Sequence, residues 1–362
     1  MKEGSIRELL ARSVDKGEIP GAVWACGTGD GIVEKGAVGF RMIRPEKKPM
    51  ETGTLFDLAS VTKCVATTSA IMILVEEGEL LLDDEIERFI PEFCGTDKEG
   101  ITIRELLTHT SGMAAWTDLY MHASSPNEII KAISKFPLEY KTGTAVVYSC
   151  LGFIVLGRIV EKVAGEPMDL LLATKVFDPL GMDNTCFNPP HDLREKAAAT
   201  EYCKWRGRIL AGEVHDENAW AMGGVSGNAG LFSQVEDLSV FAEMLLNKGK
   251  LRGVSIFSPE AVETMTSDHT NARFSDRRGL GWLIRGSGVK SSSGDLMSQK
   301  AFGHTGFTGT SIWIDPELDI FAILLTNRVH LGRDNNAHIR LRPRFHNTVV
   351  SLLLSRDVSQ IP

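Results

Sequence analysis

The chain lacks the basic stretches that a protein needs to bind nucleic acid. Among its 362 residues, 39 Lys and Arg are outnumbered by 47 Asp and Glu, which gives a formal net charge of −8 and a pI near 5.7. Because phosphate contacts need a basic surface, we do not expect a nucleic-acid partner. The rest of the composition, with 43% hydrophobic and 24% charged residues, is typical of a soluble globular protein.

Long hydrophobic runs are also missing. The longest strongly apolar stretches, residues 71–75 and 320–325, fall short of the ~20 residues that a membrane-spanning helix needs. The N-terminus carries Glu3 and Glu8 where a signal peptide has an apolar core. We therefore expect no membrane span and a cytoplasmic location.

The signatures of several common enzyme classes are absent. The segment 224–228 fails the GxSxG pattern at its last position, and no P-loop or complete dinucleotide-binding fingerprint occurs. The six cysteines include no CxxC pair, and the nine histidines show no HExxH or HxH spacing. These absences predict free thiols in a reducing compartment, with no metal and no cofactor. They leave a cofactor-free enzyme or a non-enzyme.

The predicted secondary structure changes character along the chain. Apolar residues at helical spacing dominate from about residue 60 to 200, whereas strand-like runs occur near both ends. Thr102, Ser125, Ser233 and Ser258 stand at helix starts with capping signals. The predicted elements are a helix from Ile6 to about Gly17, a hairpin of residues 21–26 and 31–40, helices at 60–77, 151–163 and 168–176, strands at 279–285, 308–314 and 319–326, and a final helix at 342–354.

This order predicts the α+β fold class. The length suggests about two domains, and strands at both ends with helices between suggest an insertion. We predict an α/β domain of residues 1–58 and 225–362 and an all-helical domain of residues 59–224, with the active-site cleft between them.

The motif Ser-x-x-Lys occurs three times, with its serine at Ser13, Ser60 and Ser287. Only Ser60 opens a long apolar helix, whose dipole is positive at that end and whose face it shares with Lys63. A serine is a poor nucleophile until a base takes its proton, and a lysine serves as that base only when its pKa is lowered. The alternative is an N-cap serine beside a solvated lysine.

Two further motifs follow Ser60 in the chain. Tyr148-Ser149-Cys150 precedes a predicted helix, and His304-Thr305-Gly306 precedes a predicted strand. The order Ser-x-x-Lys, Tyr-x-Asn, Lys/His-Thr-Gly is that of the serine β-lactamases and penicillin-binding proteins. A second candidate, Lys141-Thr142-Gly143, lies on a predicted turn just before Tyr148 and is rejected.

With these motifs the chain resembles the class C β-lactamase-like serine hydrolases, which include D,D-peptidases, D-aminopeptidases and family VIII esterases. The resemblance implies a β-lactamase/transpeptidase-like fold, in which helices flank an antiparallel sheet. Residues 212–219 and 227–232 also look like modules found beside N-acetylglucosaminidases, which hints at cell-wall metabolism. The segments that carry the family resemblance span nearly the whole chain and are residues 56–63, 106–113, 143–144, 148–149 and 303–309.

The resemblance implies a role for each motif. Ser60 would form the acyl-enzyme, Lys63 would accept its proton, and Tyr148 would relay a proton to the leaving group and later activate water. The backbone N–H groups of Ser60 and Phe307 would form the oxyanion hole. His304 would line the cleft beside Tyr148 and help to bind a substrate carboxylate.

Two positions depart from the family pattern. Cys150 replaces the usual asparagine and cannot supply both the donor and the acceptor of an amide, so amide substrates should suffer more than esters. Together with Thr305 and Gly306, Cys150 is assigned to substrate binding; the alternative is that Cys150 is the nucleophile. His304 replaces the lysine of many β-lactamases, which should make anion binding weaker and pH-dependent.

Three other positions receive structural interpretations. His109 is interpreted as a loop histidine that bonds to backbone, because Lys63 and Tyr148 already fill the proton-transfer roles. His215-Asp216 is predicted to be an exposed loop pair rather than a catalytic dyad. Cys64 is predicted to pack as a small hydrophobic side chain.

The sequence therefore predicts a serine hydrolase that cleaves an amide or ester bond through Ser60. A D-amino-acid peptide or a small ester is favoured as substrate, with β-lactams second. The alternative from another class is a binding or scaffold protein that kept the fold, which the retained Ser60, Lys63 and Tyr148 oppose. The expected partner is a small molecule or peptide, and the oligomeric state is not predicted.

Overall fold

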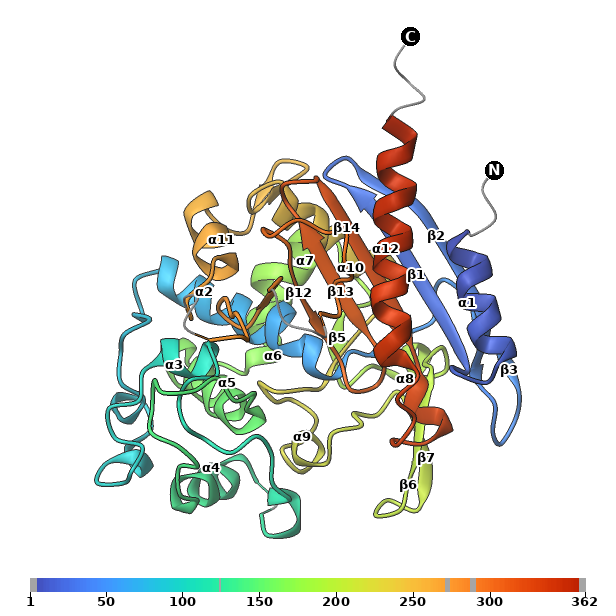
Figure 1. Cartoon of the computed structure of the whole chain (residues 1–362). Coiled ribbons are helices and arrows are strands. Elements are labelled where there is room, and N and C mark those ends of the chain that lie inside the picture. Colours follow the sequence, from blue (N-terminus) through green and yellow to red (C-terminus); the bar gives the residue numbers. More distant parts are fainter. Residues whose placement is uncertain (1–4, 124, 271–273, 287–290, 358–362) are drawn as a thin grey trace.

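The computed structural model describes residues 5–123, 125–270, 274–286 and 291–357, and its centre is an antiparallel sheet with helices on both faces (Figure 1). The strand order is β11-β12-β13-β14-β1-β2-β3, so β1 pairs with β14 and joins the two ends of the chain. The strands are β1 (Gly21–Thr28), β2 (Gly31–Met42), β3 (Lys48–Pro49), β11 (Leu283–Ile284), β12 (Phe302–Thr305), β13 (Ser311–Asp315) and β14 (Ile320–Thr326).

Both faces of the central strands β1, β13 and β14 are buried. Side chains alternate along each strand, so Trp24 and its partner Leu324 pack with helices α1 (Ile6–Asp15) and α12 (His338–Asp357). The neighbouring pair, Val23 and Leu325, points into the main core on the opposite face. Helix α10 (Val235–Leu246) covers that second face.

Four helices, α2, α3, α4 and α6, gather around the central helix α5 and contact it directly. The division into two domains at residues 58 and 224 remains a prediction. Three short sheets connect the parts: β4 (Phe56–Asp57) with β8 (Leu231–Ser233) and β5 (Cys186–Phe187), β6 (Ala199–Cys203) with β7 (Arg208–Ala211), and β9 (Lys250–Leu251) with β10 (Val254–Ser255). The helices are α2 (Ser69–Glu76), α3 (Ile103–Leu107), α4 (Pro126–Lys135), α5 (Cys150–Ala164), α6 (Met168–Leu172), α7 (Asp178–Leu180), α8 (His191–Arg194), α9 (Glu217–Ala221) and α11 (Pro259–Thr266).

The helix predicted at residues 60–77 is confirmed within one residue at each end, and it is more apolar as a whole than its short run at residues 71–75 suggested. Its span Ala59–Glu76 is long and apolar enough to cross a membrane by length and composition, and 83% of that span is buried inside the protein. The core helix of a globular protein has the same properties. It begins as a 3₁₀ turn (Ala59–Val61), continues as a π-helix (Lys63–Thr68) and ends as α2.

Several predicted element boundaries need correction. The predicted strand 279–285 is reduced to β11, because Gly281 has a φ of +77° and packs so closely that a Cβ there would lie 2.1 Å from the Thr68 hydroxyl. Strand β12 was not predicted as a strand. Ser233 does not cap α10; its hydroxyl contacts Thr185, and the N-cap residue is Gln234.

The other capping predictions are confirmed. Thr102 forms a full capping box with Glu105, and the hydroxyls of Ser125 and Ser258 accept hydrogen bonds from the first turns of α4 and α11. The predicted hairpin around residues 28–31 is also confirmed by β1 and β2.

Candidate active site

The backbone around Ser60 is held in a strained conformation. Ala59 has a φ of +46°, in the left-handed region that residues with a Cβ rarely adopt. The buried Asp57 carboxylate accepts the N–H groups of Ala59 at 2.8 Å and of His215 at 2.6 Å. Burial raises the pKa of Asp57, although these two donors oppose the rise. Asp57 therefore fixes the turn that presents Ser60.

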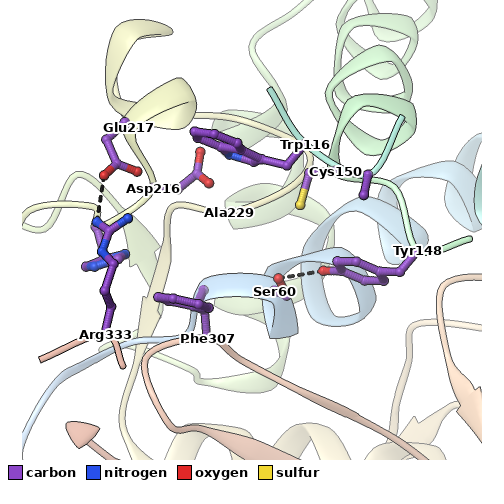
Figure 2. Close-up of a pocket in the computed structure, with 12 residues that line it drawn as sticks. Ser60, Trp116, Tyr148, Cys150, Asp216, Glu217, Ala229, Phe307 and Arg333 are labelled. Carbon is purple, nitrogen blue, oxygen red and sulfur yellow. Dashed lines mark hydrogen bonds and ion pairs between the residues drawn. The ribbon is translucent and has the colours of Figure 1, made fainter. Parts of the chain in front are cut away.

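The three predicted catalytic side chains meet at Ser60. The Tyr148 hydroxyl donates to the Ser60 Oγ at 2.6 Å (Figure 2). Lys63 Nζ donates to the same oxygen at 3.3 Å. Lys63 Nζ also donates to the Asn228 carbonyl at 2.8 Å. Lys63 Nζ lies 4.9 Å from the centroid of the Tyr148 ring, so the two groups interact electrostatically as well.

The pKa of Lys63 is not lowered, although a lysine that serves as a base needs a lowered pKa. Burial alone lowers the Lys63 pKa. The ionisable Cys150 and Tyr148 beside it raise this pKa by more than burial lowers it, so the net pKa lies above the usual value. Burial also raises the pKa of Tyr148, to about 12, despite the opposing charge of Lys63. At neutral pH both groups are therefore protonated.

Cys150 lies at the start of α5 beside this group. Its Sγ accepts a hydrogen bond from Lys63 Nζ at 3.5 Å, and its backbone N–H donates to the Ala115 carbonyl at 2.8 Å. The sulfur thus occupies the place beside the lysine that the family gives to an amide. A thiol is a weak acceptor, so Lys63 is held less firmly than an amide oxygen would hold it.

The turn after β12 brings Phe307 to the nucleophile. Among the described residues, no hydrogen-bond acceptor is found for the Phe307 N–H, which leaves it available for a substrate oxygen. The hydroxyls of Thr308 and Thr310 donate to the carbonyls of Asp57 and Leu58, which ties this turn to the segment before Ser60. A Cβ at Gly306 would lie 2.1 Å from the Thr310 hydroxyl, so this position needs glycine.

Ser60 opens into a cavity of about 310 Å³ (Figure 2). Of the predicted substrate-binding residues, Cys150 lines this cavity, whereas Thr305 and Gly306 lie outside its lining and support the Phe307 turn. The lining residues are Ala59, Ser60, Ala115, Trp116, Tyr148, Cys150, His215, Asp216, Glu217, Ala229, Phe307 and Arg333.

His304 differs most from its predicted role. Its side chain is buried, 2% exposed, and one ring nitrogen lies 2.8 Å from the Thr305 carbonyl. Burial and the nearby charges of Lys63 and Arg278 hold the pKa of His304 well below its usual value. His304 is therefore neutral, and it packs beside Tyr148 with 6.0 Å between ring centroids, outside the lining of the cavity.

The structural interpretation of His109 agrees with its contacts. It is fully buried with a φ of +60°, and its Nδ1 accepts the Ser149 N–H at 3.0 Å. Its ring packs against Tyr148 with 4.8 Å between centroids, and burial holds its pKa well below the usual value. His109 thus supports Tyr148 from behind.

The expectation for His215 is wrong. His215 is 5% exposed rather than in an exposed loop, and its Nε2 lies 2.9 Å from a carboxylate oxygen of Glu201 instead of pairing with Asp216. Glu201 also binds Arg333, which reaches on to Glu217 at 2.8 Å. Two carboxylates, those of Asp216 and Glu217, and the Arg333 guanidinium therefore line this side of the cavity, and the buried Glu201 binds Arg333 outside the lining.

Sequence reasoning missed several of these residues. Asp57 lies within the segment 56–63 that carries the family resemblance, but the sequence predicts no role for it, and Glu201 and Arg333 carry no local signal. Arg278 was also missed: it is buried, its Nε and Nη1 have no partner among the described residues, and its guanidinium carbon lies 5.8 Å from the Tyr148 ring centroid.

The rejected motif copies lie elsewhere. Lys141-Thr142-Gly143 forms a turn, in which Thr142 and Gly143 donate to the carbonyls of Ser111 and Thr110. Ser13 is buried in α1 against the far face of the sheet, and the Ser287 copy lies outside the described residues. Cys64 is buried as predicted, and its thiol contacts the Gly281 carbonyl at 3.1 Å.

Among the described residues, no group of three His, Cys, Asp or Glu side chains comes together in a way that could hold a metal ion.

Comparison with known proteins agrees with this geometry. The family model described as "Beta-lactamase" matches residues 6–344. The chain belongs to the beta-lactamase family. Within this family it is 34% identical over 362 aligned residues to "N-acetylmuramyl-L-alanine amidase" of Bacillus subtilis, with 90% of this chain and 80% of that protein covered. It is 36% identical over 308 residues to "Putative D-alanyl-D-alanine carboxypeptidase" of Escherichia coli K12, with 77% and 70% covered.

Solved structures show the same beta-lactamase fold. A penicillin-binding protein homologue from Pyrococcus abyssi matches with a TM-score of 0.75 at 24% identity, with 98% of this chain and 78% of that chain covered. The hydrolase EstCE1 matches with a TM-score of 0.74 at 22% identity, with 95% and 97% covered. The chain is thus a hydrolase of the beta-lactamase family with a penicillin-binding-protein-like fold.

Proposed function

We propose that this hydrolase cleaves an amide or ester bond through an acyl-enzyme on Ser60. The observation that carries the proposal is the position of the Ser60 Oγ, which receives hydrogen bonds from both Tyr148 and Lys63 and opens into the cavity. A nucleophile within hydrogen-bond reach of a proton acceptor is the arrangement that covalent catalysis needs.

In this proposal Lys63 and Tyr148 act as one proton-transfer pair. Both are protonated at neutral pH, so the reactive form is the pair that has lost one proton. Ser60 gives its proton to the pair through the 2.6 Å contact with Tyr148 while its Oγ attacks the carbonyl carbon. The pair then delivers that proton to the leaving nitrogen or oxygen, and water reverses the sequence to release the acid.

The backbone N–H groups of Ser60 and Phe307 would receive the negative charge that develops on the substrate oxygen. Such preorganised donors are often the largest single contribution to catalysis. The strained Ala59 and the contacts of Asp57 and Thr308 hold both donors in place before substrate arrives.

We propose a D-amino-acid peptide related to peptidoglycan, or a small ester, as the substrate. The names of the two relatives describe amide bonds next to alanine, one of them joined to an amino sugar. The cavity wall supplies carboxylates. Its Arg333 guanidinium is not an unpaired cation, because it is bound to Glu201 and Glu217. A cytoplasmic location is likewise a proposal.

A substrate panel tests the proposal. Purified protein is incubated with p-nitrophenyl esters, D-Ala-D-Ala peptides, N-acetylmuramyl-L-alanine amides and nitrocefin, and a fluorophosphonate adduct is located by mass spectrometry. We expect hydrolysis of an ester or peptide and an adduct on Ser60. An adduct on Cys150, or no adduct and no turnover, would reject the serine mechanism. Fast nitrocefin turnover without esterase activity would identify a working β-lactamase instead.

A further inference from the structure

The three exposed tryptophans of the chain lie at one place. Of six tryptophans, Trp24, Trp282 and Trp313 are buried, whereas Trp116, Trp205 and Trp220 are 44%, 43% and 40% exposed. Leaving large aromatic side chains in water forgoes the stabilisation that their burial would give. Exposed apolar groups that gather in one patch mark binding sites on soluble proteins.

These tryptophans form a continuous surface with Tyr120. The ring centroids lie 6.4 Å apart for Trp116 and Tyr120, 4.8 Å for Tyr120 and Trp205, and 4.9 Å for Trp205 and Trp220. The last two pairs meet edge to face, at 63° and 82°. We call these four residues the aromatic platform.

Buried polar contacts hold the platform together. The fully buried Asn218 on α9 donates to the Thr117 carbonyl at 2.8 Å and accepts the Tyr120 N–H at 3.0 Å, which ties two separate segments together. The guanidinium carbon of Arg206 lies 5.8 Å from the Trp205 ring centroid and 5.2 Å from that of Trp220. The platform is therefore ordered before any ligand binds, which lowers the entropic cost of binding.

The platform continues directly into the catalytic cavity. Trp116 belongs to both, and Figure 2 shows its indole extending over the cavity near Asp216. Glu217, which also lines the cavity, begins the short helix α9, and Trp220 belongs to the same helix. A substrate with its scissile bond at Ser60 can thus extend across Trp116 towards Trp205 and Trp220.

We propose that the platform binds a sugar ring of the substrate. A pyranose presents C–H groups on its faces, which pack on aromatic rings, and hydroxyls around its edge, which need hydrogen-bond partners. The platform offers both, because the Glu213 carboxylate and the Arg208 guanidinium, paired at 2.7 Å, stand beside Trp220. The inference rests on the proposed function and narrows its substrate to an amide or ester that carries a saccharide.

Binding to a non-turnover protein tests the proposal without depending on catalysis. Ser60→Ala protein is titrated by calorimetry with N-acetylmuramyl-L-alanyl-D-isoglutamine and with its sugar-free counterpart, N-acetyl-L-alanyl-D-isoglutamine. We expect the glycopeptide to bind about tenfold more tightly, as one or two aromatic stacking contacts would give. Equal binding, or no measurable binding of the glycopeptide, overturns the proposal.

Platform variants then locate the effect. In the Ser60→Ala background, Trp205→Ala and Trp220→Ala should each reduce the preference for the glycopeptide several-fold. Tyr202→Ala is the matched control, because Tyr202 is 59% exposed on the neighbouring strand β6 and makes no ring contact with the platform among the described residues. Thermal melting checks that each variant folds. If a variant does not fold, the comparison of the two ligands on the Ser60→Ala protein remains decisive.

Two other results separate this proposal from its competitors. If sedimentation shows a dimer that Trp205→Ala dissociates, the platform is an interface between copies and the sugar proposal fails. Fluorophosphonate labelling of Ser60 without any sugar preference rejects the platform alone. A sugar preference in a protein that neither labels nor hydrolyses rejects the hydrolase mechanism alone.

Discussion

The floor and the rim of the catalytic cavity are built on opposite principles. The floor consists of Ser60, Lys63 and Tyr148, which are joined by hydrogen bonds of 2.6 and 3.3 Å, and the protein buries the lysine completely. The rim consists of half-exposed aromatic rings and of ion pairs around Arg333. Electrostatic interactions are strong in the dry floor and are screened at the rim, so we expect chemistry to depend on the floor and selectivity on the rim.

The sharpest test of this contrast is removal of the nucleophile. Ser60→Ala should reduce ester hydrolysis by about 10⁴-fold or more, because the covalent route is lost. Release of p-nitrophenol measures the effect. Ser13→Ala is the matched control, since Ser13 belongs to another Ser-x-x-Lys motif but lies in α1, and its activity should equal that of the wild type. Residual activity in Ser60→Ala that disappears in Cys150→Ala would move the nucleophile to Cys150.

Removal of the proton-transfer group should have the next largest effect. Tyr148→Phe removes only the hydroxyl that contacts Ser60 and should reduce kcat by about 10²- to 10⁴-fold. Tyr148→Phe keeps the ring that packs on His109, so melting temperature should change little while activity falls. An active Tyr148→Phe enzyme would assign the whole transfer to Lys63.

The floor also predicts how the rate depends on pH. Because the pKa values of Lys63 and Tyr148 are both raised, the latter to about 12, the pair is fully protonated at pH 7 and loses its first proton only in alkaline solution. The value of kcat/KM should therefore rise with pH from 7 towards 10. A profile that rises with a midpoint near 6.5 would instead point to a histidine base.

Cys150 lies where the floor meets the cavity and should have a moderate effect. Cys150→Asn restores an amide donor and acceptor beside Lys63, and one neutral hydrogen bond contributes about 0.5–1.5 kcal/mol. Amide or β-lactam turnover should then rise about two- to twelve-fold. The ratio of amide to p-nitrophenyl ester hydrolysis measures this change, and a fall in that ratio would contradict the role given to Cys150.

The smallest effect is expected at the rim. Burial opposes ionisation of Glu201, but His215 and Arg333 bind its carboxylate and lower its pKa to about 2. A carboxyl with a lowered pKa stabilises the folded state above its unfolded pKa, and that contribution is lost as the pH falls from about 4.5 to 2. Glu201→Gln should therefore be modestly less stable to urea than the wild type at pH 7, and the difference should shrink near pH 3. A constant difference would show that the charge is irrelevant.

The floor could be predicted from sequence because its determinants are local. Ser60 and Lys63 share one helix turn, and Tyr148 and Phe307 belong to short motifs whose order is informative. Even here the pKa of Lys63 could not be predicted. It depends on which groups surround the amine, and Cys150 and Tyr148 reach it only after folding.

The rim could not be predicted because it is assembled from distant segments. Glu201 meets Arg333 across more than a hundred residues. The buried contact of Asp57 with His215, which lies outside the rim, also spans more than a hundred residues. Nothing near these residues in the chain signals a partner, so the sequence predicts an exposed His215. Strand β12 was missed for a similar reason: its Gly303 and His304 have little strand propensity, and pairing with β13 decides their conformation.

The pairing of β1 with β14 has a consequence for how the protein is made. Ala22 lies opposite Thr326, so the central pair of the sheet forms only after all the residues between these two have left the ribosome. Contacts between such distant residues are slow to form, because a long loop must close first. The β1–β2 hairpin is synthesised before β14. Until β14 is present, the edge of β1 that pairs with it is unpaired and open to aggregation. A chain whose synthesis stops before β14 should therefore need chaperone protection and should have no hydrolase activity.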